Sequence, residues 1–512
     1  MIQVGIDDIA IHIPRLYFDI KDFARLRGAN YDKLNKGLGL SAMAIPDIHE
    51  DTATMGANAV ARLIDRNALD PRAIGRIYLG TESALDGSKP TATYIMEMLE
   101  RRYSDRYGAG CFRHCDVVDL TFACIGAVDA MHNTLDWVAR GGDGQDRLGI
   151  VVFADNAKYD EGSSGEYTQG AGGGAMLLRR DPRLMVIPDL WGVATMGVHD
   201  FFKPLWGVAR RTIVESVLAL ARETGAELED DAAERILAHL PSSSQRDALL
   251  FESGTLKIHK DTPVFDGQYS NRCYSQAVKQ AFVQFQHQAT RAGRYDAERD
   301  PILTDQWSRV VLHLPYAFQG KRMFPDVFKH DRRGTEAWDA VAAEIGPEPD
   351  PDDFTDAVAL QEAQDRYRRA ISKTAQFRAF VQEKIEKGQR ASSLIGNQYT
   401  GSIFLALMST LEADLNEGND MAGASVGLCG YGSGAKAKVF EGIIQPGWRE
   451  VVSKFQLFAR LAERTALDPA AYEALHRGLR ERSVVAPTRE FALAGVGGDE
   501  GLEGARRYVW AD

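Results

Sequence analysis

The sequence is poor in the features that mark secreted and membrane-spanning proteins. Its 512 residues contain five cysteines, an odd number spread over a long chain, which does not indicate a disulfide framework. No uninterrupted apolar run is long enough to cross a bilayer, and the first residues lack the pattern of a signal peptide. We therefore expect a cytoplasmic protein with no membrane association.

Positive charge is also in deficit. Lysine and arginine number 60 against 72 aspartates and glutamates, so the formal net charge is -12. Broad binding to nucleic acid or anionic lipid is excluded because like charges repel, although an anionic small ligand needs only a local basic patch. The hydrophobic fraction of 45% and the charged fraction of 26% are those of ordinary folded proteins.

The length predicts two domain-sized units or one large pseudo-symmetric body. Short β-branched runs alternate with helical patterns in the first half, which is typical of βαβ units around a largely parallel sheet. Strands are expected at 74–79, 116–120 and 148–154, and helices at 91–102 and 125–139. The last of these strands is almost wholly apolar, which indicates that helices cover both faces of the sheet.

The chain divides into segments of different composition. We expect an N-terminal half at 1–205, a helical insertion at 206–260, a C-terminal half at 261–450 with a charged excursion at about 325–390, and a helical or extended C-terminal segment at 451–512. Three prolines within 346–353 exclude a regular helix there. No short-period repeat is visible, although two similar halves are compatible with the order of segments.

Cys124 is the first candidate for chemistry. It follows the strand at 116–120 and precedes the helix at 125–139, so its thiol is expected at a helix N-terminus. Unpaired N–H groups and the positive end of the helix dipole favour a thiolate there and improve the nucleophile. Taken alone, a single cysteine is more commonly a small buried residue.

The sequence around Cys124 changes that interpretation. Residues 121–126 read Thr-Phe-Ala-Cys-Ile-Gly and resemble the nucleophile motif of hydroxymethylglutaryl-CoA synthases. Residues 74–83 are similar to the segment that supplies the catalytic glutamate of that family, which places Glu82 in this role. Further segments resemble family landmarks in the expected order: 155–159, 165–172, 199–204, 264–268, 312–316, 397–402 and 430–434.

The resemblance implies a thiolase-like five-layered αβαβα fold of two similar halves, here with helical insertions, and generally a homodimer. It assigns catalysis to Glu82, Cys124 and His313. By the same resemblance, the residues that bind substrate or coenzyme A (CoA) are Asp155, Tyr159, Thr168, Asp200, Phe201, Pro315, Lys321, Arg322, Asn397, Tyr399 and Ser433.

The implied reaction joins acetyl-CoA, acetoacetyl-CoA and water into 3-hydroxy-3-methylglutaryl-CoA and CoA. A thiolate at Cys124 would hold the acetyl group as a thioester, and a carboxylate at Glu82 would remove a proton from its methyl group. His313 would donate to the ketone oxygen of the acceptor, with Asn397 and Ser433 orienting acyl oxygens. CoA thioesters are the substrates, and no cofactor or metal is expected.

Each of these residues also has a simpler interpretation. Glu82 is alternatively a loop carboxylate that caps the next helix, His313 a satisfied core histidine, and Asn397 a helix cap. Two glycine-rich stretches are not nucleotide motifs: 170–175 runs into a strand where a helix is required, and 430–434 lacks the Gly-Lys-Ser/Thr ending of a P-loop. The cysteines at 111 and 115 lack a second ligand pair for zinc.

Two departures from the family leave other functions open. Phe318 stands where the family usually has a lysine, so Lys321 and Arg322 become the candidates for CoA phosphates. The insertion at 206–260 is longer than expected. The alternatives are a β-branching synthase whose acceptor sits on an acyl carrier protein, a decarboxylating ketoacyl synthase, and a non-enzymatic CoA-binding protein.

Overall fold

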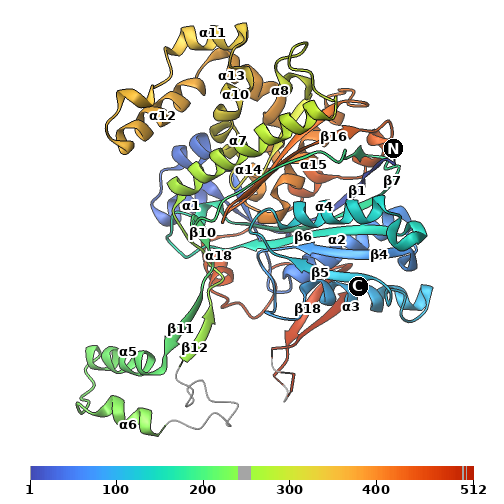
Figure 1. Cartoon of the computed structure of the whole chain (residues 1–512). Helices are drawn as coiled ribbons and strands as arrows, with labels where there is room; N and C mark the ends of the chain where they lie inside the picture. The colour runs from blue at the N-terminus through green and yellow to red at the C-terminus, as the bar shows by residue number, and fades with distance from the viewer. Residues whose placement is uncertain (1, 240–254, 499–500, 503) are drawn as a thin grey trace. The chain divides into compact units, whose positions relative to one another are not determined.

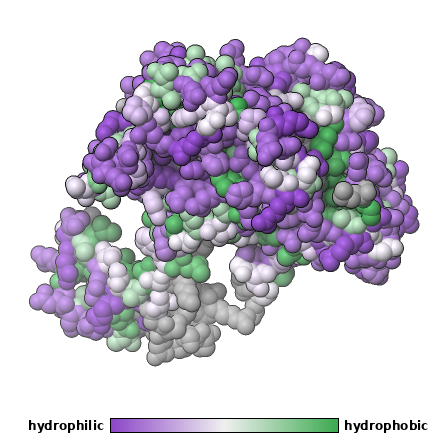
Figure 2. Space-filling model, turned by 45° about the horizontal axis from the view of Figure 1, so that its top comes forward, coloured by the Kyte–Doolittle hydropathy of each residue, from purple (hydrophilic) through white to green (hydrophobic). Residues whose placement is uncertain are grey.

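The computed structural model describes residues 2–239, 255–498, 501–502 and 504–512. Contacts within the chain separate two compact units, one made of residues 1–200 and 266–512 and the other of residues 201–265. Hydrophilic residues dominate the face drawn in Figure 2. None of the helices in the described part of the chain has the length and apolarity to cross a membrane.

The larger unit contains a ten-stranded sheet in two halves (Figure 1). The N-terminal half is ordered β1-β7-β6-β4-β5 and the C-terminal half β9-β16-β15-β14, and the two-residue strand β8 pairs with both β1 and β16. The strands are β1 (Val4–His12), β4 (Ile74–Gly80), β5 (Asp116–Leu120), β6 (Leu148–Ala157), β7 (Gly170–Arg180), β8 (Met185–Val186), β9 (Trp191–Thr195), β14 (Arg309–Leu312), β15 (Ser425–Gly432) and β16 (Lys436–Ile444).

The two halves repeat one strand arrangement. In the N-terminal half β6 runs parallel to β4 and antiparallel to β7, which is antiparallel to β1. In the C-terminal half β15 runs parallel to β14 and antiparallel to β16, which is antiparallel to β9. The expectation of two similar halves is therefore confirmed.

Helices complete five layers. Helices α2 (Thr52–Asn67) and α3 (Thr91–Tyr107) cover the outer face of the N-terminal half, and α7 (Gly267–Arg291) covers the outer face of the C-terminal half. Helices α4 (Gly126–Ala139) and α15 (Ser402–Asn416) lie between the halves. The ring of Phe404 on α15 stacks on that of Phe153 on β6, with centroids 5.3 Å apart. This is the expected αβαβα order.

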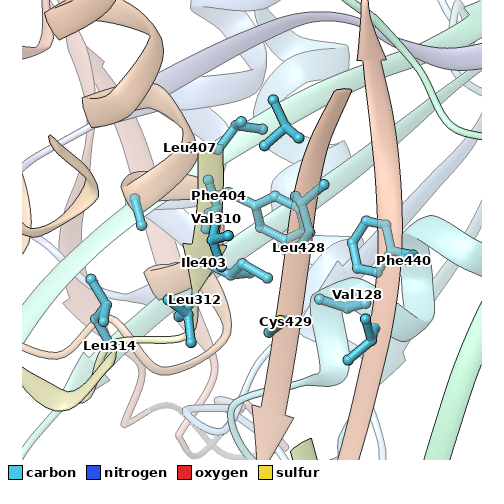
Figure 3. Packing of buried hydrophobic residues seen from close by; sticks show 14 of the residues in the cluster. Val128, Val310, Leu312, Leu314, Ile403, Phe404, Leu407, Leu428, Cys429 and Phe440 are labelled. Atoms are coloured by element: carbon cyan, nitrogen blue, oxygen red, sulfur yellow. The ribbon is translucent and has the colours of Figure 1, made fainter. Parts of the chain in front are cut away.

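The central layer forms the main hydrophobic core (Figure 3). Helix α15 is buried on every side from Ser402 to Asp414, which is the pattern of a helix enclosed by other elements. It packs against apolar residues of β14 and β15, among them Val310, Leu312 and Leu428. Burying one such side chain contributes about 1.5–3 kcal/mol. The core thus holds the two halves, and the strand ends that carry the candidate site, in a fixed relation.

The remaining elements of the larger unit surround this core. They are β2 (Leu16–Asp19), α1 (Ile20–Arg27), β3 (Ala42–Ile45), α8 (Leu303–Gln306), α9 (Gln319–Met323), α10 (Pro325–Arg332), α11 (Glu336–Ile345), α12 (Ala357–Ile371), α13 (Ala375–Phe380), α14 (Glu386–Ile395), α16 (Trp448–Val452), α17 (Leu457–Ala462), β17 (Thr465–Ala466), α18 (Pro469–His476), β18 (Glu490–Val496) and β19 (Arg506–Ala511). The proline-rich stretch contains one 3₁₀ turn, Pro351–Asp353, and no regular helix, as predicted.

The smaller unit combines helices with short antiparallel ladders. It contains β10 (Phe201–Phe202) paired with β13 (Val264–Phe265), β11 (Leu205–Ala209) paired with β12 (Thr255–His259), and helices α5 (Arg210–Glu223) and α6 (Ala232–Ala238). Helices α5 and α6 lie in the segment expected to be a helical insertion, and the strands β11 and β12 were not predicted. Their pairing joins segments about 50 residues apart, which local periodicity does not reveal. Residues 240–254 lie outside the described part.

Candidate active site

The predicted catalytic residues follow the carboxyl ends of parallel strands. Strands β4, β5 and β6 run parallel. Glu82 follows β4, Cys124 follows β5, and Asp155 lies near the end of β6. His313 directly follows β14, which is parallel to β15. Loops at this edge of an α/β sheet are where ligands commonly bind, because side chains of several strands converge there.

Cys124 lies on a sharp turn before α4. Ala123 has a φ of 37°, a left-handed conformation that costs a non-glycine residue about 1–3 kcal/mol. The turn holds the Cys124 thiol 3.0 Å from Oε1 of Glu82, as a hydrogen bond from Sγ. Cys124 is 8% exposed, so this contact is shielded from bulk water. The structure therefore brings together two residues that the sequence placed in separate motifs.

Asp155 connects the Glu82 loop with the C-terminal half. Its fully buried carboxylate accepts hydrogen bonds from the backbone N–H of Glu82 at 2.8 Å and from the Thr81 hydroxyl at 2.9 Å. Its other oxygen lies 3.1 Å from the N–H of Thr400 and 2.5 Å from the Thr400 hydroxyl. Burial raises the pKa of Asp155. Asp155 thus ties the backbone of Glu82 to Thr400 of the C-terminal half.

Two buried tyrosines lie beside these residues. The rings of Tyr159 and Tyr399 are 6.5 Å apart between centroids, and burial raises the pKa of both phenols above the usual 10. Both therefore keep their protons at neutral pH and can donate hydrogen bonds to an acyl oxygen. The Asn397 side chain accepts from the N–H of Tyr399 at 2.8 Å, and the Asn397 N–H donates to the carbonyl of Thr168 at 3.0 Å.

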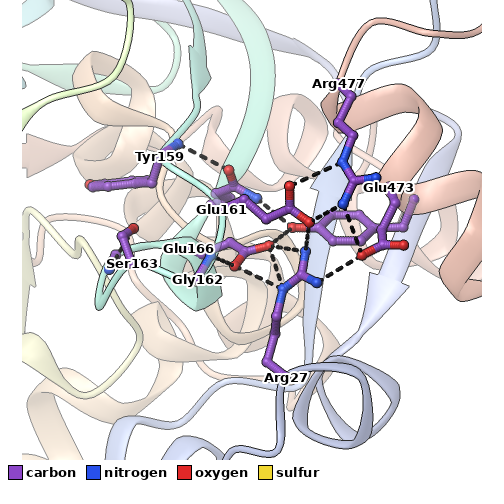
Figure 4. A network of polar contacts seen from close by, with 11 residues as sticks. Arg27, Tyr159, Glu161, Gly162, Ser163, Glu166, Glu473 and Arg477 are labelled. Carbon is purple, nitrogen blue, oxygen red and sulfur yellow. Dashed lines mark hydrogen bonds and ion pairs between the residues drawn. The ribbon is translucent and has the colours of Figure 1, made fainter. Parts of the chain in front are cut away.

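A buried ion network fixes the loop between β6 and β7 that carries Tyr159 and Thr168 (Figure 4). The carboxylate of Glu166 is fully buried and pairs with Arg27 of α1 at 2.9 Å. Arg27 also pairs with Glu161 at 2.9 Å and with Glu473 of α18 at 2.8 Å. The Tyr472 hydroxyl donates to Glu166 at 2.8 Å. Segments from the two ends of the sequence therefore hold one loop of the site.

His313 is buried and its ring has no hydrogen-bond partner among the described residues. Its backbone N–H donates to the carbonyl of Cys429 at 3.0 Å, and its carbonyl accepts from the Tyr274 hydroxyl at 2.9 Å. Both ring nitrogens lack a partner in the described part of the chain. An unsatisfied buried polar atom costs about 1–3 kcal/mol, so this pattern favours a ligand-facing histidine over a satisfied core histidine. Burial lowers the pKa of His313 to about 3, so the ring is neutral.

The C-terminal half approaches the Cys124 turn closely at one glycine. A Cβ on Gly432 would lie 2.8 Å from the Phe122 carbonyl oxygen and 2.9 Å from the Ile125 nitrogen. Gly432 ends β15, three residues after Cys429, whose carbonyl holds the backbone of His313. The missing side chain therefore lets the His313 side of the site abut the Cys124 side.

Asp200 holds the turn that carries Ser433. Its buried carboxylate accepts from the Tyr431 hydroxyl at 2.8 Å, from the Gly434 N–H at 2.8 Å and from the Ser270 hydroxyl at 3.1 Å. Ser433 is half-buried in this turn between β15 and β16. Phe201, the next predicted residue, belongs to the smaller unit, where its ring lies 6.2 Å from that of Phe265.

Comparisons with known proteins agree with this geometry. Family models for the N-terminal and C-terminal parts of hydroxymethylglutaryl-coenzyme A synthase match residues 2–182 and 256–492. The chain belongs to the hydroxymethylglutaryl-CoA synthase family. It is 30% identical over 519 residues to the hydroxymethylglutaryl-CoA synthase of Haloferax volcanii, with 100% of both chains covered. The enzyme of that name from Enterococcus faecalis is 27% identical and covers 92% of this chain and 91% of its own.

A solved structure of MvaS in complex with 3-hydroxy-3-methylglutaryl coenzyme A has the same fold. The two chains are 26% identical and fully covered, with a TM-score of 0.75. The expected family and thiolase-like fold are thus confirmed. The roles of single residues are not tested by these comparisons and stay predictions.

The predicted CoA contacts lie on the segment after His313. Pro315 is half-buried in the loop, and Lys321 and Arg322 belong to α9. The Lys321 ammonium lies 3.1 Å from the ring centroid of Phe318, and Arg322 donates to the carbonyl of Gly37 at 2.8 Å. Phe318, Lys321 and Arg322 line a cavity of about 610 Å³. Lys321 therefore brings a positive charge to the position where this chain departs from the family pattern.

Sequence reasoning missed several residues that shape the site. Thr400 lies within the predicted segment 397–402, but its bond to Asp155 crosses 245 residues. Tyr274 lies on α7 outside every motif, and its hydroxyl supports His313. Gly432 belongs to the turn segment 430–434, and its role depends on a contact with another strand end. No local signal in the sequence identifies such contacts.

Proposed function

We propose that this member of the hydroxymethylglutaryl-CoA synthase family catalyses the condensation of acetyl-CoA, acetoacetyl-CoA and water through acetyl-Cys124. The products are 3-hydroxy-3-methylglutaryl-CoA and CoA. The observation that carries the proposal is the 3.0 Å contact between the Cys124 thiol and the Glu82 carboxylate. His313, whose two ring nitrogens have no partner among the described residues, belongs to the C-terminal half, which approaches the Cys124 turn at Gly432. Family membership and the relatives that carry this enzyme's name support it.

Acetylation is the first step. The Cys124 sulfur attacks the carbonyl carbon of acetyl-CoA, the carbon–sulfur bond to CoA breaks, and the thiol proton of Cys124 passes to the leaving CoA sulfur. In this step Glu82 acts only as the acceptor of the hydrogen bond from Sγ, which orients the Cys124 thiol. The backbone N–H of Cys124, just before α4, is the candidate donor for the oxyanion.

Condensation is the second step. The Glu82 carboxylate removes a methyl proton from acetyl-Cys124, and the carbanion forms a carbon–carbon bond with C3 of acetoacetyl-CoA. Neutral His313 donates an N–H hydrogen bond to the ketone oxygen, where negative charge develops. One proton passes from the methyl group to Glu82, and the new hydroxyl group gains one proton, so the step balances. Water then cleaves the Cys124 thioester, which releases the product and restores the thiol.

An acceptor carried by an acyl carrier protein is the second candidate. Phe318 under the Lys321 ammonium replaces a residue that the resemblance associates with CoA, which favours a changed acceptor contact. Comparing kcat/KM for acetoacetyl-CoA and for an acetoacetyl-loaded carrier protein separates the two. A higher kcat/KM for the carrier-bound acceptor would show that acetoacetyl-CoA is not the acceptor. A decarboxylating ketoacyl synthase is disfavoured because its reaction needs no base beside the thiol, whereas a carboxylate, Glu82, lies 3.0 Å from the Cys124 sulfur.

Three further features belong to this proposal. The mevalonate pathway to isoprenoid precursors is the proposed setting and the cytoplasm the proposed location. A homodimer is also proposed. Strand β5 stands at one end of the strand order and pairs with β4 alone among the described strands, so its other edge is open to a second copy of the chain. Light scattering on a size-exclusion column measures the oligomeric state, and a monomer at micromolar concentration would contradict the dimer.

Intact-mass measurement after incubation with acetyl-CoA tests the central step. We expect one acetyl adduct in the unaltered chain and none in Cys124→Ala. The matched control is Cys273→Ala, which removes another buried cysteine and is expected to acetylate normally. An adduct that persists in Cys124→Ala would overturn the assignment of the nucleophile.

A further inference from the structure

A second cavity lies on the larger unit and shares no residue with the candidate site. Its volume is about 1260 Å³, and helices α2 and α17 contribute to its wall together with the segments around His12, Thr488 and Trp510. The lining is unusually basic for an acidic protein. It contains the arginines Arg15, Arg62, Arg66, Arg102, Arg460, Arg464 and Arg489 and the acidic residues Asp65, Glu463, Glu490 and Asp512.

Carboxylates neutralise part of this arginine cavity. Arg15 pairs with Glu490 at 2.9 Å, and Arg102 pairs with Asp65 at 3.0 Å. Arg66 pairs with Asp8, which lies behind the wall, at 2.6 Å. The other arginines, which are Arg62, Arg460, Arg464 and Arg489, have no carboxylate partner among the described residues. The cavity therefore holds more positive charge than its own acidic groups balance.

Burying guanidinium groups without a carboxylate partner costs free energy. Burial, together with the nearby charges of Arg460 and Arg66, lowers the pKa of Arg62 to about 10. Burial also lowers the pKa of Arg464 to about 10. Buried N–H groups without a hydrogen-bond partner in the described part of the chain include Nη1 of Arg464 and Nε of Arg66, Arg102 and Arg460. Such groups call for a partner that the described part of the chain does not supply, such as water, an ion or a ligand.

The chemistry of the lining selects the ligand class. Guanidinium groups bind phosphate oxygens through paired N–H donors and stay charged, which suits an anion with several phosphate oxygens. The volume exceeds what inorganic phosphate needs and suits an organic molecule. Trp510 offers an aromatic surface, with the Arg102 guanidinium carbon 3.6 Å from its ring centroid. The lining thus combines guanidinium groups with one planar aromatic ring.

We propose that this arginine cavity binds a phosphorylated small molecule that carries two or more phosphate charges, such as a nucleoside diphosphate. The site is independent of the proposed condensation, since its residues take no part in the Cys124 chemistry. CoA itself carries phosphates and is the second source of this ligand chemistry. The test therefore separates the two sources.

Isothermal titration calorimetry on the full chain with inorganic diphosphate, ADP and CoA measures the binding. Arg460→Gln and Arg489→Gln remove two arginines without carboxylate partners, and Arg291→Gln removes an exposed arginine at the end of α7 as a control. We expect diphosphate and ADP to bind with a Kd raised about tenfold or more in the first two variants, because each loses a charge-assisted contact. The control is expected to bind like the unaltered chain.

Thermal unfolding separates a binding role from a structural one. Without ligand, Arg460→Gln is expected to keep or raise the Tm because it relieves repulsion with Arg62. At equal concentration, diphosphate should raise the Tm of the unaltered chain more than that of the variant. No diphosphate binding, or equal binding in all variants, would overturn the proposal. A third result would also overturn the proposal: both variants bind diphosphate normally, and saturating CoA abolishes that binding. Diphosphate would then occupy the CoA site.

Discussion

Oε1 of Glu82 accepts a hydrogen bond from the Cys124 thiol at 3.0 Å across 42 residues of sequence. The contact needs a proton between sulfur and oxygen, because a thiolate and a carboxylate at this distance repel each other. Acetylation of Cys124 removes that proton and leaves a carboxylate beside the new methyl group. The same geometry therefore serves both proposed steps, with Glu82 first as a hydrogen-bond acceptor and then as the base.

Glu82→Gln should separate these steps. The amide keeps the size of the side chain but cannot take a proton, so we expect acetylation to continue and condensation to fall roughly a hundred- to ten-thousand-fold. Intact mass reports the acetyl adduct, and release of CoA with acetoacetyl-CoA present reports condensation. Normal condensation by the variant would refute the role of Glu82 as the base.

Arg27→Ala should destabilise the chain and loosen the loop that carries Tyr159 and Thr168. It leaves the fully buried Glu166 without its cation, which typically costs about 3–5 kcal/mol. Urea unfolding measures the loss, and a raised KM for acetyl-CoA reports the loop. Arg25→Ala, on the same helix, breaks an exposed pair with Asp22 and should cost less than about 1 kcal/mol. Equal losses in both variants would contradict the network's role.

Gly432→Ala should impair the joint between the two halves. The added methyl group would press on the Phe122 carbonyl and the Ile125 nitrogen, and a shift of the Cys124 turn by about 1 Å can lower the rate about a hundred-fold. The measurement is kcat for condensation beside the Tm. Gly495→Ala on β18 meets open space and serves as the control. Full activity in Gly432→Ala would show that the close approach is not needed.

Stability should fall on the acid side partly because of His313. Burial lowers its folded-state pKa to about 3 from the ordinary 6.5, so the unfolded chain binds the proton more readily. This contribution is complete above pH 6.5 and is lost as the pH falls toward 3, by about 1.4 kcal/mol per pH unit.

Urea unfolding at several pH values checks this slope. His313→Gln should show a shallower decline below pH 6.5 than the unaltered chain, whereas the exposed His287→Gln should not. Identical slopes for His313→Gln and the unaltered chain would contradict a neutral buried imidazole.

Local sequence patterns predicted much of the secondary structure. The strands and helices from β4 to β6 lie where β-branched runs and helical periodicity placed them, because a buried parallel sheet demands near-continuous apolar strands. The family motifs also indicated Glu82, Cys124 and His313 separately. The strands β11 and β12 escaped prediction because their pairing partners lie far apart in the chain.

The sequence by itself determined the family of the protein, the residues predicted for its chemistry and the order of its segments, since residue type and short-range spacing carry that information. Only the tertiary structure decided that Asp155 ties Glu82 to Thr400, that Gly432 admits the Cys124 turn, and that seven arginines share one cavity. The physical reason is common to these cases. Each depends on contacts between residues that lie far apart in the sequence.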